Sequence, residues 1–600
     1  MGFFDKITMK KAKRSTFDLS HNHLTTLNIG DLVPVYSDFL LPGDRINLKA
    51  DIKAQFSPLV APAYARMRIK LEHFFVPFSQ LFTDYQEVFL NYKKESKTVV
   101  QDGVSASYNF SEFPFIYAGE IGLYFNALFG YSSSMTDDQL RALSRYDFNG
   151  KVLPYHQSRC SRLLSAFGLP LPLWLPRYSS VSPGGNVYNP LWKLFTGLDS
   201  PTNADYAFGL VCQPQAVPGS NPSYNVTDKT PKINTFFARA YQKIYNDWYI
   251  DQITNEKVDL YENTVHINVP LTGGSFVPFY RYFNSLFMMR KRCYRKDYYN
   301  TSAIDPTLGP SSVAIPQTVN DLRKANAMQR ILDKKAVAGD KFYDWLKFTW
   351  NVFADNYEID RSVYLGGTTI NCKVSEVVQS SESSQLSPLG QKAGELNAAG
   401  FGAGSSFVAP DYGVIMSIVS LVPDIDYYCG IPRKMMATSW DDFPMPEMSQ
   451  IGMQDIKSLE LKLPVNHYKS SGTGPTFDNP EWDLTHSFGF VPRYSEYKYF
   501  PNQITGEFAT LLKYWHQSPN YYRIDSVLSG KNLYNWIGHD KWFAEIGQGA
   551  DVVMNQGNTN QYYNDIFSVT SDQVGDHCRM SIWFDESVNR ALPVQDMPHL

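Results

Sequence analysis

The residues of this chain that could carry catalysis do not occur at the spacings that catalysis requires. Its eleven histidines include no HExxH pair, no GxSxG turn presents a nucleophilic serine, and His21 and His23 are interpreted as polar surface residues. Gly400, Gly402 and Gly404 could cradle a phosphate, but no Lys-Ser/Thr pair follows them. We interpret these glycines as a flexible loop before a buried strand. The sequence therefore predicts no catalytic residue, no metal site and no cofactor.

Two pairs of carboxylates keep one enzymatic alternative open. Asp424 with Asp426, and Asp441 with Asp442, could serve as the two acidic groups that flank the bond cleaved by a glycoside hydrolase. Acidic pairs of this kind are also common in loops, so they carry little weight. The alternative that they leave is a β-sandwich protein that binds or hydrolyses carbohydrate.

Two clusters of basic residues could bind nucleic acid. Residues 1–16 hold five cations and a single aspartate, and residues 290–296 interleave cations with a tyrosine. Cations track phosphates and aromatic rings stack on unpaired bases, so this mixture suits a single strand. A solvated terminus and an ordinary protein interface are the simpler interpretations of the two clusters. The candidate contact residues are Lys10, Lys11, Lys13, Arg14, Arg290, Lys291, Arg292, Tyr294, Arg295 and Lys296.

The cysteines and the apolar segments indicate neither a disulfide framework nor a membrane anchor. The six cysteines lie far apart and form no CxxC pair, which predicts reduced thiols. No run of about eighteen apolar residues occurs, and the N-terminus lacks the apolar core of a signal peptide. We therefore expect a soluble chain that is not exported.

The composition favours a subunit of an assembly. Aromatic residues make up 15% of the 600 residues and charged residues only 19%, so much of the surface is expected to be uncharged or buried against other chains. A β-rich monomer with many exposed tyrosines would have the same composition. The net charge of −4 gives no overall attraction for nucleic acid, so any such contact must be local.

Most readable segments predict β-strands. Alternation of apolar and polar residues is clearest over Met67–Phe75, and residues 28–56 suggest short strands joined by turns such as Pro42-Gly43-Asp44. Further strands are predicted at Val414–Val422, Ser458–Leu463, Thr485–Val491 and Arg579–Phe584.

Helices are predicted in the connections between these strands. Phe237, Tyr241, Ile244 and Trp248 recur every three or four residues, which indicates an amphipathic helix capped by Thr235. A helical hairpin is predicted over residues 318–353, and the pair Gly366-Gly367 then interrupts the pattern before an extended segment. Shorter helices are expected at residues 137–144 and 191–196.

Several segments, taken in order along the chain, resemble one protein family. They are RSTFDLSHNHLTTLNIGDLVPVYSDFLLPGDRINL, HFFVP, ARAYQKIYNDWYIDQ, RKRCYRKDYYNTSAIDP, TVNDLRKANAMQRILDKKAVAGDKFYDWLKFTWNV, DRSVYLGGTT, FGFVPRYSEYKYFPNQITGEF and WFDESVNRALP. Together they cover about two thirds of the chain and are similar to the major capsid proteins of the microviruses, small single-stranded DNA phages, particularly the gokushovirus-like and related gut lineages.

This resemblance implies a mainly β fold, an eight-stranded antiparallel jelly roll of the viral capsid type with long helix- and loop-containing insertions. It implies that sixty copies form a T=1 icosahedral shell around a circular single-stranded DNA genome, with no enzymatic activity. The further partners that it implies are a small basic DNA-binding protein, other virion proteins, and a host surface receptor such as a glycan. Assembly is expected in the host bacterial cytoplasm, and the product is a virion.

The chain departs from the gokushovirus pattern at one place. Those proteins carry a large surface insertion where only residues 309–317 lie here, so we expect residues 100–234 to supply the outward decoration instead. The expected organisation is a basic arm (1–16) and a single jelly-roll domain (17–600), with an outer elaboration at about 78–234 and a helical insertion at about 235–365. The helical hairpin then packs beside the sandwich or a neighbouring subunit, with Tyr364–Thr368 as the turn that re-enters the shell.

Overall fold

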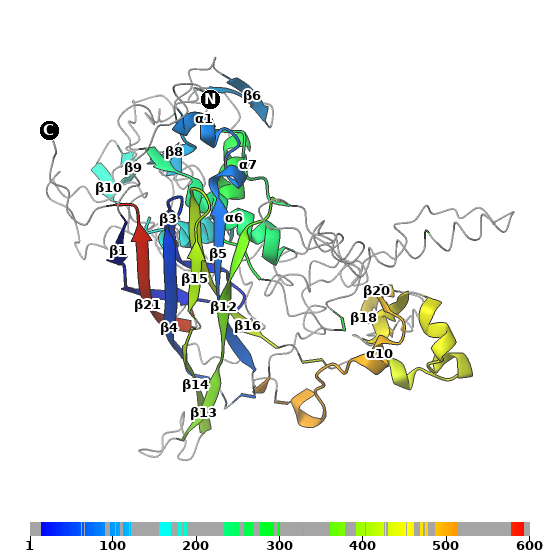
Figure 1. The fold of residues 1–600 in the computed structure, drawn as a ribbon. Coiled ribbons are helices and arrows are strands. Elements are labelled where there is room, and N and C mark those ends of the chain that lie inside the picture. Colours follow the sequence, from blue (N-terminus) through cyan, green and yellow to red (C-terminus); the bar gives the residue numbers. More distant parts are fainter. Residues whose placement is uncertain are drawn as a thin grey trace, which may run out of the picture.

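The computed structural model describes residues 14–121, 155–188, 232–299, 328, 360–516 and 576–592, with short gaps inside most of these ranges. This part of the chain is built mainly from antiparallel strands, with helices gathered against one sheet (Figure 1). Among the described residues, no helix is both long and apolar enough to cross a membrane.

Two large sheets form the body of the protein. The seven-stranded sheet has the order β1-β21-β4-β14-β13, with β2 also paired to β21 and β15 to β4. Its strands are β1 (Ser15–Asp18), β2 (His21–Leu27), β4 (Arg45–Phe56), β13 (Lys373–Val378), β14 (Lys392–Phe401), β15 (Ser405–Val408) and β21 (Cys578–Arg590). The four-stranded sheet has the order β12-β5-β16-β3, from β3 (Val33–Leu40), β5 (Met67–Pro77), β12 (Val363–Asn371) and β16 (Gly413–Pro423).

The chain passes back and forth between the two sheets, as it does in a jelly roll. Strand β3 belongs to the smaller sheet, β4 to the larger and β5 to the smaller again, and the late strand β16 lies between β3 and β5, antiparallel to both. The expected mainly β, antiparallel jelly-roll architecture is confirmed. The expected count of eight strands is not, because the two described sheets hold seven and four.

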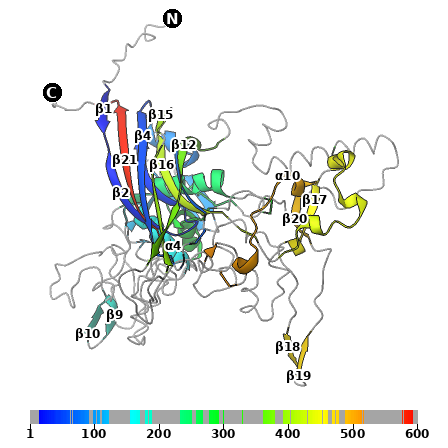
Figure 2. The same ribbon diagram turned by 90° about the horizontal axis from the view of Figure 1, so that it is seen from below.

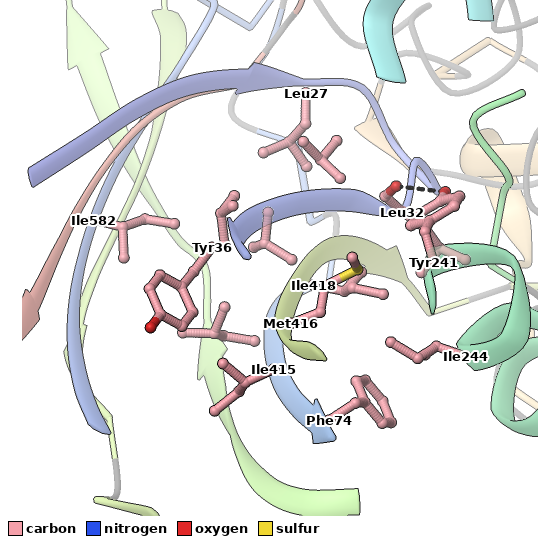
Figure 3. Packing of buried hydrophobic residues seen from close by; sticks show 14 of the residues in the cluster. Leu27, Leu32, Tyr36, Phe74, Tyr241, Ile244, Ile415, Met416, Ile418 and Ile582 are labelled. Atoms are coloured by element: carbon pink, nitrogen blue, oxygen red, sulfur yellow. Dashed lines mark hydrogen bonds between the residues drawn. The ribbon is translucent and has the colours of Figure 1, made fainter. Parts of the chain in front are cut away.

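The smaller sheet is covered on both faces, so the hydrophobic core lies on both sides of it. All eleven residues of β16 are buried, because one face meets the larger sheet and the other meets a layer of helices. Figure 3 shows Ile415 on the side of Tyr36 and Ile582, whereas Ile418 lies toward Tyr241 and Ile244. The helices of this layer are α4 (Tyr155–Ala166), α6 (Phe236–Ile244), a π-helical turn (Tyr245–Tyr249) and α7 (Val277–Phe287).

Shorter elements decorate this body. One group, from the first half of the chain, holds a 3-10 turn (Phe78–Gln80), α1 (Tyr85–Phe89), β6 (Lys97–Gln101), β7 (Val104–Tyr108), β8 (Phe115–Tyr117), β9 (Tyr178–Ser182), β10 (Gly185–Tyr188) and β11 (Lys232–Asn234). A second group, to one side of the sandwich in Figures 1 and 2, holds β17 (Met453–Lys457), β18 (Tyr468–Ser471), β19 (Gly474–Phe477), β20 (Ser487–Pro492) and α10 (Ser495–Lys498). Five 3-10 turns accompany it, at Arg433–Met435, Trp440–Asp442, Pro446–Ile451, Ser458–Glu460 and Gly506–Ala509.

Most predicted strands are confirmed. The structure contains strands where they were expected around residues 67–75, 414–422, 485–491 and 579–584, and the turn before β4 has Gly43 at a positive φ of 79°. The helix over residues 237–248 is also confirmed, although its last turn is π-helical. Thr235 is at its N-terminus but does not cap it, because the threonine hydroxyl instead accepts a hydrogen bond from Arg239.

Three predictions are wrong for identifiable reasons. Ser458–Glu460 is a 3-10 turn, and the strand of that region is β17, which comes before it. Tyr364–Thr368 is not a turn but part of β12, where the ladder skips Leu365 in a bulge and both glycines pair with residues of β5. Gly400 does not lie in a flexible loop, since it belongs to β14.

The predicted helical hairpin over residues 318–353 lies outside the described residues, apart from Met328, which is helical. The short helices predicted at residues 137–144 and 191–196 also lie outside the described residues.

Because β16 is buried on both faces, truncating one of its side chains should lower the stability of the chain substantially. Ile418→Ala should lower the stability of the chain by roughly 2–5 kcal/mol, because the truncation leaves a cavity between the smaller sheet and α6. The exposed Leu90 offers a matched control, and Leu90→Ala should leave thermal unfolding nearly unchanged. Equal melting temperatures for the two variants would contradict the two-sided burial.

Candidate nucleic-acid interface

The structure describes four of the ten residues predicted to contact nucleic acid. Arg14 is exposed and directly precedes β1, where its guanidinium donates a hydrogen bond to the carbonyl oxygen of Gly43. Arg290, Lys291 and Arg292 follow α7. Outside the described residues lie Lys10, Lys11, Lys13, Tyr294, Arg295 and Lys296.

The segment 290–292 forms a short ladder with residues 30–32. The backbone N–H of Leu32 donates to the carbonyl oxygen of Arg290 at 3.1 Å, and that of Arg292 donates to Gly30 at 2.8 Å. Lys291, between them, makes an antiparallel bridge with Asp31 and is only 3% exposed. The backbone of this part of the basic cluster is therefore hydrogen-bonded to the segment that precedes β3.

The side chain of Arg290 joins the segment to the helix layer. Its Nε donates to Oε1 of Gln242 at 2.8 Å, and a terminal nitrogen donates to the carbonyl oxygen of Ser285 at 3.1 Å. Its backbone N–H donates to the hydroxyl of Tyr241 at 2.8 Å. That hydroxyl in turn donates to the carbonyl oxygen of Leu32 at 2.8 Å (Figure 3). Burial raises the pKa of Tyr241, so the hydroxyl stays protonated and able to donate.

Arg292 makes the central ion pair between the helix layer and the smaller sheet. Its terminal nitrogens lie 2.5 Å and 3.3 Å from the two carboxylate oxygens of Glu72 on β5, and one also donates to Ser420 on β16. The hydroxyl of Tyr249 donates to the same carboxylate at 2.7 Å. Burial acts to raise the pKa of Glu72, but the charge and hydrogen bonds of Arg292 outweigh it, so that pKa lies below its usual value.

These contacts give the described part of the basic cluster a structural role. The guanidinium groups of Arg290 and Arg292 both donate to partners inside the chain, in a bidentate geometry at Glu72 that suits a partly buried ion pair. The sequence could not reveal this role, because Glu72 lies 220 positions from Arg292. A nucleic-acid contact by the cluster stays a prediction.

A set of hydrogen bonds joins two of the segments that resemble the capsid family. Lys243 of α6 donates to the carbonyl oxygen of Asp360 at 2.8 Å. One turn later, a carboxylate oxygen of Asp247 accepts from both the backbone N–H and the hydroxyl of Ser362, each at 2.8 Å, and the indole N–H of Trp248 donates to the same hydroxyl at 2.9 Å. The helix ARAYQKIYNDWY and the segment DRSVYLGG are thus a single structural unit that leads into β12.

Arg239 is a buried residue of that helix whose role the sequence did not reveal. It is fully buried, and its guanidinium donates to the Thr235 hydroxyl at 3.1 Å and to the carbonyl oxygens of Leu81 and Thr264 at 3.0 and 2.6 Å. Burial lowers its pKa, and the hydrogen bonds to oxygen offset part of the cost of burying the charge. Arg239 therefore ties the start of α6 to two loops.

Several residues considered for catalysis or metal binding have structural partners, and the side chain of Asp441 lies outside the described part of the structure. Asp424 forms an ion pair with Arg68 at 2.6 Å, and Asp442 accepts hydrogen bonds from the backbone of Ser439 and its neighbour. Asp426, whose pKa burial raises to about 6, lies beside the Asp424 pair. His21 stacks on Phe584 with ring centroids 5.2 Å apart. Within the described ranges, no group of three or more His, Cys, Asp or Glu side chains could hold a metal ion.

Comparison with known proteins gives consistent results along the chain. The model of a phage family described as capsid protein (F protein) matches residues 5–108 and 308–600. The chain is 23% identical to capsid protein VP1 of Chlamydia phage 1 over 566 residues, covering 87% of this chain and 90% of that protein. It is 25% identical to capsid protein VP1 of Bdellovibrio phage phiMH2K over 531 residues, covering 86% of each, and 20% identical to that of Spiroplasma virus 4 over 544 residues, covering 88% of each.

The Arg292–Glu72 pair predicts a pH-dependent loss of stability in the variant Glu72→Gln. The change leaves a partly buried guanidinium without its counter-charge, which should cost roughly 2–4 kcal/mol at neutral pH. Because the pKa of Glu72 is lower in the folded chain than its ordinary value of 4.5, the stabilisation is complete above that value and is lost as the pH falls through the folded pKa. Thermal unfolding between pH 3 and pH 8 measures the difference.

The exposed ion pair between Lys232 and Glu112, at 2.7 Å, provides the control. Glu112→Gln should cost about 0–1 kcal/mol at any pH in this range, because solvent screens the pair. If Glu72→Gln lowered the melting temperature no more than this control, Arg292 would not depend on Glu72.

Proposed function

This chain belongs to the phage capsid protein (F protein) family, and we propose that sixty copies of it form a T=1 icosahedral shell that encloses a circular single-stranded DNA genome. It is a capsid-forming protein, and its place is in the virion. The proposal also includes assembly in the cytoplasm of a bacterial host and no enzymatic activity.

The observation that supports the proposal most strongly is that the residues matched by the family model include the whole sandwich. The matched residues, 5–108 and 308–600, include all eleven strands of the two large sheets. The intervening residues hold α4, α6 and α7, the helices of the layer that covers the smaller sheet. The whole sandwich therefore lies within the part of the chain that the family model matches.

Exposed apolar side chains support contacts between subunits. They concentrate in the group of elements beside the sandwich, where an isolated chain would leave them in water. Interfaces are enriched in such aromatic residues and methionines. Members of this set are Met435, Trp440, Phe443, Tyr497, Tyr499, Phe500 and Leu511.

The remaining partners are proposed from the family and from local charge. The basic arm, residues 1–16, would contact the enclosed DNA, because a net charge of −4 leaves no overall attraction for it. Residues 78–234 would form the outer elaboration and meet a host receptor such as a glycan, and a small basic DNA-binding protein and other virion proteins would complete the particle. The comparisons do not support the alternative of a carbohydrate-binding or glycan-hydrolysing protein.

Negative-stain electron microscopy of the purified chain tests the shell. We expect uniform icosahedral particles, because the family is one of capsid proteins and the monomer exposes aromatic surface. A protein that remained a monomer at high concentration and acted on glycans would contradict the proposal.

Neutralising the basic arm tests the proposed DNA contact. The variant with Lys10, Lys11, Lys13 and Arg14 changed to Gln should form shells that contain less DNA. The affinity of this variant for single-stranded DNA should also depend less on salt. Each phosphate contact contributes about 0.7 to the slope of log affinity against log salt concentration, so the loss of the four cations should reduce the magnitude of that slope by roughly 3. Exchanging the three lysines for Arg and Arg14 for Lys preserves the charge and serves as the control. Unchanged DNA content and an unchanged slope in the Gln variant would show that the basic arm does not contact DNA.

A further inference from the structure

On one face of the seven-stranded sheet, most side chains of the described strands are exposed. One set of alternate side chains on its strands packs into the core and the other set points away, as the burial pattern of β4 and of β21 shows. We call the second set the outer face, formed by the outward-pointing residues of β4, β13, β14 and β21. Single exposed apolar side chains are common on protein surfaces, so the arrangement of those on this face is the informative feature.

Two aromatic rings lie in one cross-strand row of the outer face. Trp583 of β21 is paired with Asp51 of β4, and Asp51 is paired with Phe401 of β14. Trp583 is 49% exposed and Phe401 is 86% exposed. Since neighbouring strands are about 4.8 Å apart, the two rings originate roughly 10 Å from each other, on either side of β4.

Phe401 lies between two glycines at which the backbone approaches its neighbours closely. A Cβ at Gly400 would lie 2.8 Å from the side chain of Ile370, and a Cβ at Gly402 would lie 2.6 Å from the carbonyl oxygen of Ala50. Without these side chains the chain packs closely against both neighbours and turns toward β15. Gly400 and Gly402, which resemble part of a phosphate loop in the sequence, therefore permit close packing on either side of Phe401.

Cations surround the aromatic row. Arg45, Lys49 and Lys53 recur every fourth residue of β4, so all three point to the outer face, about 13 Å apart along the strand. Lys49 and Lys53 flank the row at Asp51, and Arg579 lies on the neighbouring strand opposite Gln55.

The outer face also carries carboxylates, but fewer. Over the described strands of this sheet, the outward-pointing cations are Arg45, Lys49, Lys53, Lys373 and Arg579, and the outward-pointing carboxylates are Asp18, Asp51, Glu395 and Asp585. The excess is positive on a chain whose total charge is −4. This charge is complementary to a polyanion.

The basic arm begins at the edge of the same face. Arg14, the first described residue, precedes β1, whose residue Ser15 pairs with Arg590 at the end of β21. Its guanidinium donates to the carbonyl oxygen of Gly43, two residues before Arg45. Arg14 therefore lies at the end of β4 where the row of cations starts.

We propose that the outer face binds a stretch of the enclosed single-stranded DNA. Trp583 and Phe401 stack on bases, and the cations of β4 contact the phosphates, the combination by which proteins bind single strands without reading their sequence. The inference rests on the proposed function, because it takes the enclosed genome as the ligand. A second copy of the chain is disfavoured as the occupant, since the core of a protein interface is depleted in charged residues and this face carries them on every strand.

Binding of the full-length chain to a fluorescein-labelled oligo(dT) twenty-mer, followed by anisotropy at fixed salt, tests the inference. The double variant Phe401→Ala and Trp583→Ala should bind about tenfold more weakly or worse, because each lost ring removes a stacking contact. A duplex of the same length should compete poorly, since its bases are not available for stacking. The matched control is Tyr64→Ala with Leu90→Ala, two exposed apolar residues that lie neither on the outer face nor in the set proposed for subunit contacts, and this variant should bind like the unaltered chain.

Photocrosslinking gives a readout that a purely structural role would not move. Oligo(dT) with 5-iododeoxyuridine should form adducts on the tryptic peptide of residues 580–590, which contains Trp583. Adducts confined to other peptides would overturn the assignment.

The outcomes separate this inference from the proposed function. If shells of the unaltered chain protect DNA from nuclease but the Phe401 and Trp583 variant binds the oligonucleotide normally, the inference fails and the proposed function stands. If that variant binds DNA normally but sediments as a monomer, the face is a contact between subunits and the inference fails. If the unaltered chain forms no DNA-containing shells, the proposed function fails as well.

Discussion

The covering of the smaller sheet on both faces is the constraint on which the rest of the structure depends. A strand as apolar as β16, buried along its whole length, must have a packed layer on each side. The larger sheet supplies one layer and α6 with its neighbours supplies the other. The helices are therefore part of the core in this protein, although they arise from a connection between strands and lie outside the sequence matched by the family model.

Polar contacts fix that helix layer in place. Arg292 with Glu72 joins it to β5, and Asp247 with Ser362 joins it to the segment that enters β12. Both contacts involve residues far apart in sequence and largely removed from water, where a charge without its partner is costly. The basic cluster around Arg290 that resembled a nucleic-acid site thus includes groups that hold the protein together.

The sequence predicted local features well and long-range features poorly. The alternation in Met67–Phe75 and the apolar run in Val414–Val422 predicted β5 and β16, because burial periodicity is a local property. Gly366 and Gly367 were misinterpreted as a turn because a bulge within a ladder and a break between elements have the same composition. The partner of Arg292 and the fully buried Arg239 depend on tertiary contacts that no local pattern contains. The outer face was missed for the same reason, since Trp583 and Phe401 become neighbours only through β4.

The two sheets of this capsid protein therefore have different roles. The smaller sheet is enclosed by protein, whereas the larger one offers a face of cations and rings to a ligand. An icosahedral cryo-electron microscopy reconstruction of assembled particles tests this account most directly. The account predicts sixty copies with the outer face turned to the interior and nucleic-acid density against Trp583 and Phe401. A reconstruction with that face buried against a neighbouring subunit, or turned to the exterior, would contradict it.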